Sequence, residues 1–106
     1  MDYTERLRHL AIQDDLVADR DGGAIDAEAT DLDPKTLALV RLAALVAVGG
    51  AVPSYGAQAD VALSAGASAA EIVDVLFGVA PVVGYARVVA AAPKLAIALG
   101  FDTDEE

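Results

Sequence analysis

Residues 67–84 have the sequence ASAAEIVDVLFGVAPVVG, which contains both the start and the body of a helix. Ser68 and Glu71 form a capping box, in which the hydroxyl and the carboxylate each accept a hydrogen bond from a backbone N–H at the helix start. Apolar side chains after Glu71 point in nearly every direction around the axis, which predicts a helix buried on all sides. We expect Pro81 to kink or end this helix and Gly84 to redirect the chain.

Similar signals on either side of this stretch predict further helices. Asp33 is an N-cap residue before Pro34, and the helix that they open should stop at 49–50, where two glycines follow each other. Pro53 is expected to start the next helix and Gly66 to supply its left-handed cap. A last helix is predicted from about residue 85 to residue 92, with Pro93 as a break and with another turn or two over 94–99.

The first third of the chain has a different composition. Tyr3, Leu7, Leu10 and Val17 recur at helical spacing, so residues 1–19 are predicted to form an amphipathic helix. Glycines and acidic residues dominate 20–32, which indicates a loop. Since no alternating strand pattern occurs, we expect an all-α, single-domain subunit of five to six helices, with a core over 33–100 and an acidic tail over 101–106.

The chain has more apolar residues than a small monomer can bury. Hydrophobic residues make up 56% of its 106 residues, against roughly 45–50% in ordinary globular chains. The longest uncharged stretch, 42–59, contains three glycines and a proline and is bounded by Arg41 and Asp60, which argues against a membrane span. Burial between identical subunits is therefore the predicted use of the surplus.

Charge and cysteine content exclude several classes of function. The formal net charge is −10, and no basic patch for a phosphate backbone is present, so nucleic acid is not an expected partner. The 106 residues contain no cysteine, which removes disulfides, thiolate metal sites and thiol redox chemistry. No metal or cofactor is predicted. With no secretory leader pattern at the first residues, we expect a cytoplasmic protein.

Seven polar residues are embedded in the apolar helices, and all except Asp60 are candidates for a binding site: Arg41, Ser54, Tyr55, Gln58, Asp60, Tyr85 and Arg87. Buried polar groups need partners, and two interpretations of the arginines stay open. In one, they form ion pairs with Asp60, Asp74 or a carboxylate of a neighbouring subunit. In the other, an arginine holds the carboxylate of a small acid between helices, where tyrosine and glutamine side chains orient it.

The order of these signals resembles a known family. Leu32-Asp33-Pro34-Lys35 opens a helix containing Leu-Val-Arg-Leu-Ala-Ala-Leu, and Gly66-Ala67-Ser68-Ala69-Ala70-Glu71-Ile72 opens another. This pattern is similar to that of the carboxymuconolactone decarboxylase and alkylhydroperoxidase D-like family, over about two-thirds of the chain. The resemblance implies an all-helical subunit that assembles into trimers or hexamers.

The same resemblance also implies positions for an active site. In the hydroperoxidase branch, a Cys-x-x-Cys pair is followed four residues later by a histidine, and a glutamate lies on the preceding helix. Counted back from Gly66, these positions correspond to Ala51, Ser54 and Gln58, with the glutamate on or next to Ala38. A serine hydroxyl cannot cycle through a disulfide, and a glutamine cannot exchange a proton near neutral pH.

Three functions follow from these observations. The first is a family-type enzyme acting on a small carboxylic acid or lactone without a thiol, with Arg41 or Arg87 as the anion clamp. Its pocket would be lined by Ser54, Tyr55, Gln58 and Tyr85, of which Ser54, Tyr55 and Gln58 are the candidate catalytic residues. The second is a non-catalytic, ligand-binding or scaffold oligomer, and the sequence leaves the choice between these two open. The third, hydroperoxide reduction, is opposed by the absence of cysteine.

Overall fold

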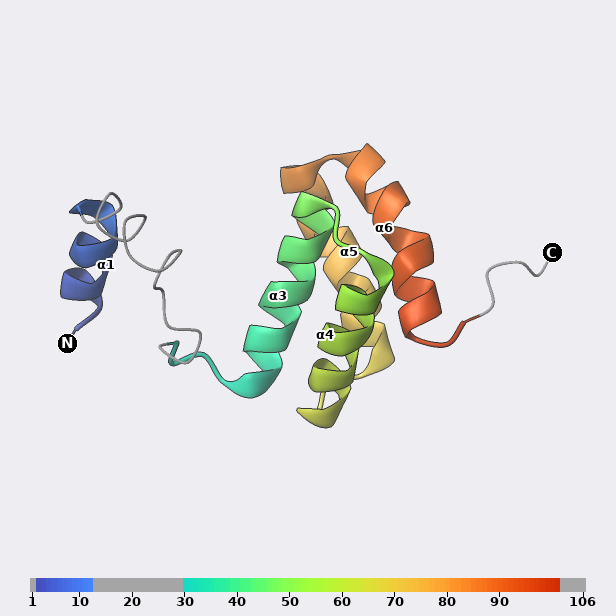
Figure 1. Ribbon diagram of the computed structural model, residues 1–106, viewed down its shortest axis with the longest axis horizontal. Coiled ribbons are helices and arrows are strands. Elements are labelled where there is room, and N and C mark those ends of the chain that lie inside the picture. Colours follow the sequence, from blue (N-terminus) through green and yellow to red (C-terminus); the bar gives the residue numbers. More distant parts are fainter. Residues whose placement is uncertain (1, 13–29, 102–106) are drawn as a thin grey trace. The chain divides into compact units, whose positions relative to one another are not determined.

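A computed structural model describes residues 2–12 and 30–101, and within them it contains five helices and no strand (Figure 1). The helices are α1 (Tyr3–Ile12), α3 (Pro34–Val48), α4 (Val52–Ser64), α5 (Ala69–Val83) and α6 (Tyr85–Ala98). The all-α prediction is confirmed. The predicted continuation of the first helix through Val17 and most of the predicted loop lie outside the described residues. No described helix has both the length and the hydropathy that crossing a membrane requires.

The chain divides into two units, residues 1–31 and residues 32–106. In the first unit, the Asp2 carboxylate accepts a hydrogen bond from the Glu5 backbone N–H at 2.9 Å and so caps α1. Arg6 forms an ion pair with Asp31 at 3.4 Å. No side chain of α1 is buried.

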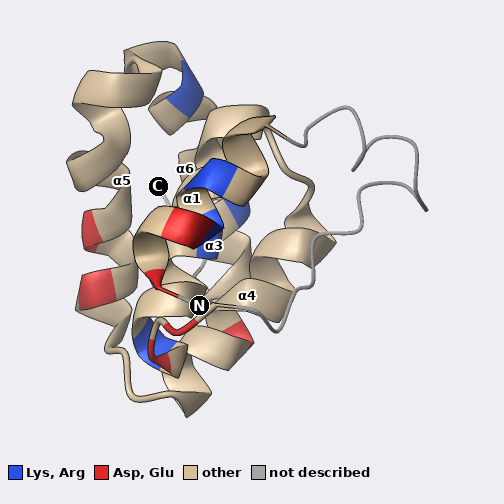
Figure 2. Cartoon of the chain, turned by 90° about the vertical axis from the view of Figure 1, so that its left-hand side faces the viewer, with Lys and Arg blue, Asp and Glu red and all other residues tan. Residues whose placement is uncertain are grey.

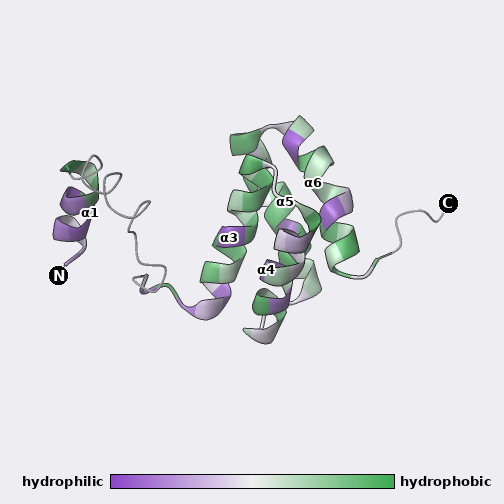
Figure 3. Cartoon of the chain, in the orientation of Figure 1, coloured by the Kyte–Doolittle hydropathy of each residue, from purple (hydrophilic) through white to green (hydrophobic). Residues whose placement is uncertain are grey.

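The second unit is a four-helix bundle built around small and aliphatic side chains. Each helix packs mainly on two others, α3 and α6 both lying against α4 and α5, so the four close into a ring. Apolar residues cover most of these helices (Figure 3). The core is formed by ten buried residues: Ala38, Leu42, Val46, Tyr55, Ala62, Ala67, Ile72, Leu76, Ala91 and Leu95.

The predicted boundaries of α3 and α4 and the predicted start of α5 agree closely with the structure. Asp33 caps α3 by accepting a hydrogen bond from the Thr36 backbone N–H at 2.7 Å, and Gly49 ends it with a φ of 80°. Gly66 has the predicted positive φ, at 102°. Ser68 and Glu71 form both hydrogen bonds of the capping box.

The predicted break at Pro93 is wrong, and α5 does not end at Pro81. Pro81 lies inside α5, which ends only before Gly84, and Pro93 lies inside α6, which continues to Ala98. Both prolines are exposed, and buried Ala91 and Leu95 on either side of Pro93 hold α6 in the bundle across the missing hydrogen bond.

The prediction that α5 is buried on all sides is wrong for a single chain. Only Ile72 and Leu76 of this helix are buried, while Phe77 is 73% exposed and Val82 is 86% exposed. The four-helix ring covers one side of α5 and leaves an apolar side open.

Charge is distributed unevenly along the sequence. Between Leu32 and Phe101 the chain has four acidic and four basic residues, so this stretch is formally neutral: Asp33, Asp60, Glu71 and Asp74, and Lys35, Arg41, Arg87 and Lys94. Few charges therefore interrupt the helices of the bundle (Figure 2). The net charge of −10 comes entirely from the residues before and after this stretch.

Candidate functional site

An open surface hollow of about 360 Å³, called the cavity below, lies between α3 and α4. This volume is within the range of pockets that bind small molecules. Its lining consists of six residues, three from each helix: Arg41, Ala44, Leu45, Ser54, Ala57 and Gln58. The structure thus brings together Arg41, Ser54 and Gln58, three of the six residues predicted for the site.

The lining residues meet because both helices present the same spacing to the cavity. On each helix the three residues lie at positions i, i+3 and i+4, starting from Arg41 on α3 and from Ser54 on α4. Residues with this spacing lie on one face of a helix. The contributions of Ala44, Leu45 and Ala57 were not predicted, although this spacing from Arg41 and Ser54 could have indicated them.

The turn between the two helices fixes how these faces meet. The N–H groups of Gly49 and Gly50 both donate to the Leu45 carbonyl, at 2.8 and 2.9 Å. A Cβ atom on Gly50 would lie 2.7 Å from Leu45 Cδ2 and 3.2 Å from Leu45 Cβ, so a larger residue here would displace the side chain of this lining residue. Lys94 of α6 donates from Nζ to the Gly50 carbonyl at 2.9 Å, a contact that the sequence analysis did not anticipate.

The polar groups of the lining differ in exposure. Arg41 and Gln58 are half-buried, and Ser54 is exposed. The Oε1 atom of Gln58 is buried and has no hydrogen-bond partner. The guanidinium of Arg41 carries five N–H donors.

Tyr55 lies in the bundle core and does not line the cavity. Its side chain is fully buried, and its hydroxyl has no hydrogen-bond partner. Removal from water raises the pKa of this phenol above its ordinary value. The hydroxyl is thus a buried neutral group at physiological pH.

Tyr85 and Arg87 also lie away from the cavity lining. Tyr85, the first residue of α6, is 78% exposed. Arg87 is exposed, with Nη1 3.9 Å from the position of a Cβ atom on Gly49. Within the described residues, Arg87 forms no ion pair with Asp60 or Asp74.

A second hollow, of about 490 Å³, lies beside the start of α3 and the end of α4. Its lining contains a carboxylate, Asp60, and a hydroxyl, Ser64, and no basic residue. An anion would be repelled here, so this hollow does not fit the predicted acidic ligand.

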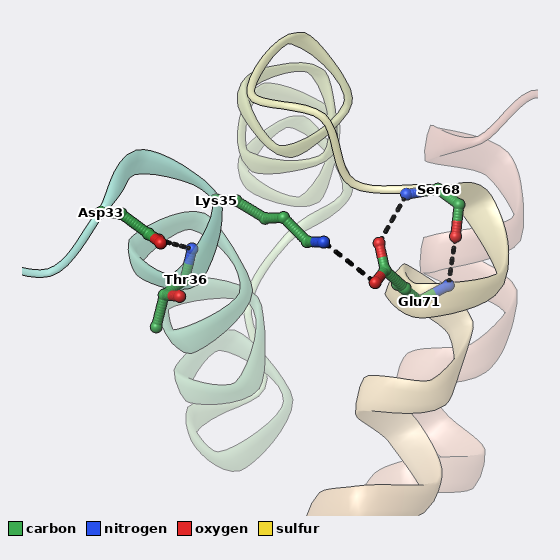
Figure 4. A network of polar contacts seen from close by, with 5 residues as sticks. All are labelled: Asp33, Lys35, Thr36, Ser68 and Glu71. Carbon is green, nitrogen blue, oxygen red and sulfur yellow. Dashed lines mark hydrogen bonds and ion pairs between the residues drawn. The ribbon is translucent and has the colours of Figure 1, made fainter.

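The Asp-Pro-Lys stretch at 33–35 and the Ser-x-x-Glu stretch at 68–71 contact each other away from the cavity (Figure 4). Glu71 accepts a hydrogen bond from the Ser68 backbone N–H at 2.9 Å and one from Lys35 Nζ at 3.0 Å. The Ser68 N–H and then Lys35 lower the pKa of Glu71 below its ordinary value. Hydrogen bonds from Thr36 likewise lower the pKa of Asp33. The contact between Lys35 and Glu71 joins the start of α3 to the start of α5.

The lining of the cavity is suited to bind a ligand group that accepts hydrogen bonds. Arg41 provides a fixed positive charge, and Ser54 and Gln58 provide neutral hydrogen-bonding groups. Apart from Arg41, none of the six lining residues is ionisable, and Ser54 has no general base among them. The lining can therefore hold and polarise a carboxylate or a carbonyl, whereas it contains no group for proton transfer at neutral pH.

These features define a class of protein. It is an all-helical bundle with a small cavity between two consecutive helices, and one arginine gives this cavity a positive charge. The chain belongs to the carboxymuconolactone decarboxylase family, whose model matches residues 15–96. No curated protein and no solved structure matches the chain.

Proposed function

We propose that this family member binds a small carboxylic acid or lactone in the cavity between α3 and α4. The observation that supports this function is the convergence of Arg41, Ser54 and Gln58 on one cavity. Ser54 and Gln58 occupy the positions that the family resemblance assigns to a cysteine and a histidine. The ligand would therefore occupy the family's site and meet a different set of groups.

Each polar lining residue has a separate role in this proposal. The Arg41 guanidinium binds the carboxylate through charge-assisted hydrogen bonds. The Ser54 hydroxyl and the Gln58 amide contact the rest of the ligand, and Ala44, Leu45 and Ala57 enclose its carbon skeleton.

Calorimetric titration of the full chain with succinate, glutarate and pentanoate tests this function. Replacing Arg41 by Ala should weaken the binding of each ligand at least tenfold, because a hydrogen bond to a charged group contributes about 1.5–3 kcal/mol. Arg8→Ala removes the same charge from an exposed position on α1 and should leave binding unchanged. Equal binding by Arg41→Ala and the parent chain, or no binding by the parent chain, would refute the proposal.

A non-catalytic role is the second candidate, and the absence of a titrating group from the cavity lining favours it. A member of this kind would bind carboxylates without converting them. Proton NMR of the chain incubated with carboxylated γ-lactones distinguishes the two functions. If the lactone loses a carboxyl group with the parent chain and not with Arg41→Ala, the protein is an enzyme. If the lactone binds without turnover, the protein is a ligand-binding protein.

We also propose that the chain forms a homo-oligomer, as a trimer or a hexamer. The supporting observation is an apolar stripe on the exposed side of α6, formed by Tyr85, Val89, Pro93 and Ile97 at intervals of four residues. Tyr85 is 78%, Val89 49% and Ile97 55% exposed. No charged residue lies within this stripe, so a second copy of the same face could cover it without burying a charge.

A further inference from the structure

Three polar residues of the apolar helices lie on the surface of the bundle and outside the cavity: Asp60, Tyr85 and Arg87. Asp60 lines the second hollow, beside the start of α3. Tyr85 and Arg87 lie in the first turn of α6, and Arg87 is next to Gly49 at the other end of α3. Figure 1 shows the end of α4 and the start of α6 at opposite ends of the bundle. The 15 residues of α3 span about 22 Å, so Asp60 and Arg87 of one chain cannot pair.

The second hollow has the chemistry of a site for a cation with apolar neighbours. Its other lining residues are Pro34, Val61, Ser64 and Ala65, and Val61 is 48% exposed. Asp60 is exposed and forms no ion pair within the residues that the structure describes. A purely apolar surface over this hollow would take the carboxylate out of water without a counter-charge, which is unfavourable. The occupant therefore needs a basic group beside its apolar residues.

Arg87 is the basic residue of the bundle that meets this requirement. Lys35 and Lys94 already bond to a carboxylate and to a carbonyl of their own chain, and Arg41 lines the cavity. Arg87 is exposed, and between residues 30 and 101 it forms no ion pair. Its charge is thus available to a partner.

Arg87 also borders the apolar stripe of α6. Ala90 is exposed and lies one turn from Arg87 and one turn from Pro93 of the stripe, so a single small residue separates the charge from the apolar surface. A planar guanidinium beside apolar residues matches a carboxylate in an apolar hollow, both in charge and in hydrogen-bonding geometry.

We propose that the α6 stripe of one copy covers the second hollow of the next copy, and that Arg87 of the first pairs with Asp60 of the second. This inference rests on the proposed homo-oligomer, because it names the two faces that meet in it. A face that covers only itself joins two copies, whereas a contact between two different faces closes into a ring when the rotation between copies allows it. Repeated around a threefold axis, this contact gives the proposed trimer.

Charge reversal on both sides of the contact tests the pair. Asp60→Arg and Arg87→Asp each place like charges opposite each other, so each should weaken self-association at least tenfold in sedimentation velocity. The double variant that combines them restores opposite charges and should assemble within about threefold of the parent chain. Asp74→Arg is the matched control, because it makes the same reversal at an exposed position on α5, and it should leave self-association unchanged.

Cysteine cross-linking shows whether two different faces meet. The parent chain contains no cysteine, so a single thiol can be placed on either side of the contact. Ser64→Cys puts a thiol in the hollow, and Ala90→Cys puts one beside Arg87. With a short bismaleimide, the two single variants expressed together should give covalent dimers on a denaturing gel, and either variant alone should give none.

The results separate this inference from the proposed oligomer. If the parent chain sediments as a monomer, both are wrong. If it assembles, but either reversal leaves assembly unchanged or the double variant stays dissociated, the pair is wrong while the oligomer stands. Cross-linking by one single variant alone, or none by the two together, would show that the hollow and the α6 stripe do not meet. Circular dichroism should show the parent's helix content in every variant, since each changed position is exposed in one chain.

Discussion

Tyr55 and Gln58 lie three residues apart on α4, and each buries an oxygen without a hydrogen-bond partner. The two residues differ in what surrounds them. Gln58 is half-buried and lines the cavity. The Tyr55 side chain is completely enclosed by the bundle, and its hydroxyl destabilises the fold because no interaction replaces the lost hydration.

Replacing Tyr55 by Phe should therefore stabilise the protein. The ring stays in the core and the unpartnered hydroxyl is removed, so the free energy of unfolding should rise by about 1 kcal/mol. Urea denaturation followed by circular dichroism measures this change. Carboxylate affinity should be the same in both proteins, and a loss of either stability or binding in Tyr55→Phe would show that the hydroxyl has a partner or a role in the site.

The candidate site could be predicted in part from single residues. Arg41 was identified from its polarity, and Ser54 and Gln58 from their polarity and the resemblance, and all three line the cavity. Tyr55, Tyr85 and Arg87 had equal support from polarity, yet they lie elsewhere. Their placement depends on the rotation of α4 and α6 within the bundle, which packing against other helices sets and which local sequence does not reveal.

Among the elements, the starts of α3 and α5 are the best defined by sequence. Asp33 and Ser68 cap their own helices, and Lys35 joins the two caps through Glu71. These helix starts could be predicted because capping depends on residues three positions apart. The continuation of α6 through Pro93 could not, since contacts with distant helices outweigh the lost hydrogen bond.

Glu71 makes the stability of the protein dependent on pH in the acid range. Its pKa is lowered in the folded state, so its carboxylate stabilises the fold above its ordinary pKa, about 4.3 in unfolded chains, and this stabilisation is lost as pH falls through the lowered folded value. The melting temperature of the parent chain should exceed that of Glu71→Gln at pH 7, and the difference should shrink towards zero near pH 3.

Differential scanning calorimetry between pH 3 and 7 checks this expectation. Asp74→Gln is the matched control, because Asp74 is an exposed acidic residue of the same helix. The difference in melting temperature between Asp74→Gln and the parent chain should not shrink in the same way between pH 7 and pH 3. A constant difference between Glu71→Gln and the parent chain across this pH range would mean that the Glu71 carboxylate does not stabilise the fold through its charge.

At the scale of the whole molecule, the exposed apolar surface is the main feature that a single chain leaves unexplained. Phe77 and Val82 on α5 and the stripe along α6 are open to water in one chain. The apolar surplus in the composition predicted such a surface, whereas the particular helices that carry it became known only from the packing of the four-helix ring.

Substitution of two residues in the α6 stripe should dissociate the proposed oligomer. Burying an aliphatic side chain contributes about 1.5–3 kcal/mol, so Val89→Asp with Ile97→Asp should weaken self-association at least a hundredfold. Sedimentation velocity measures the change, and circular dichroism should show an unchanged helix content. A parent chain that sediments as a monomer, or a double variant that still assembles, would contradict the proposed interface.

The contact between Lys35 and Glu71 has a consequence for how members of this family are interpreted. The Asp-Pro-Lys and Ser-x-x-Glu stretches stabilise two helix starts, and neither stretch contributes a residue to the cavity. A chain can therefore keep these stretches while the residues of the cavity are replaced. Such a signature identifies a scaffold, and the reaction has to be inferred separately for each member from the side chains that α3 and α4 place between them.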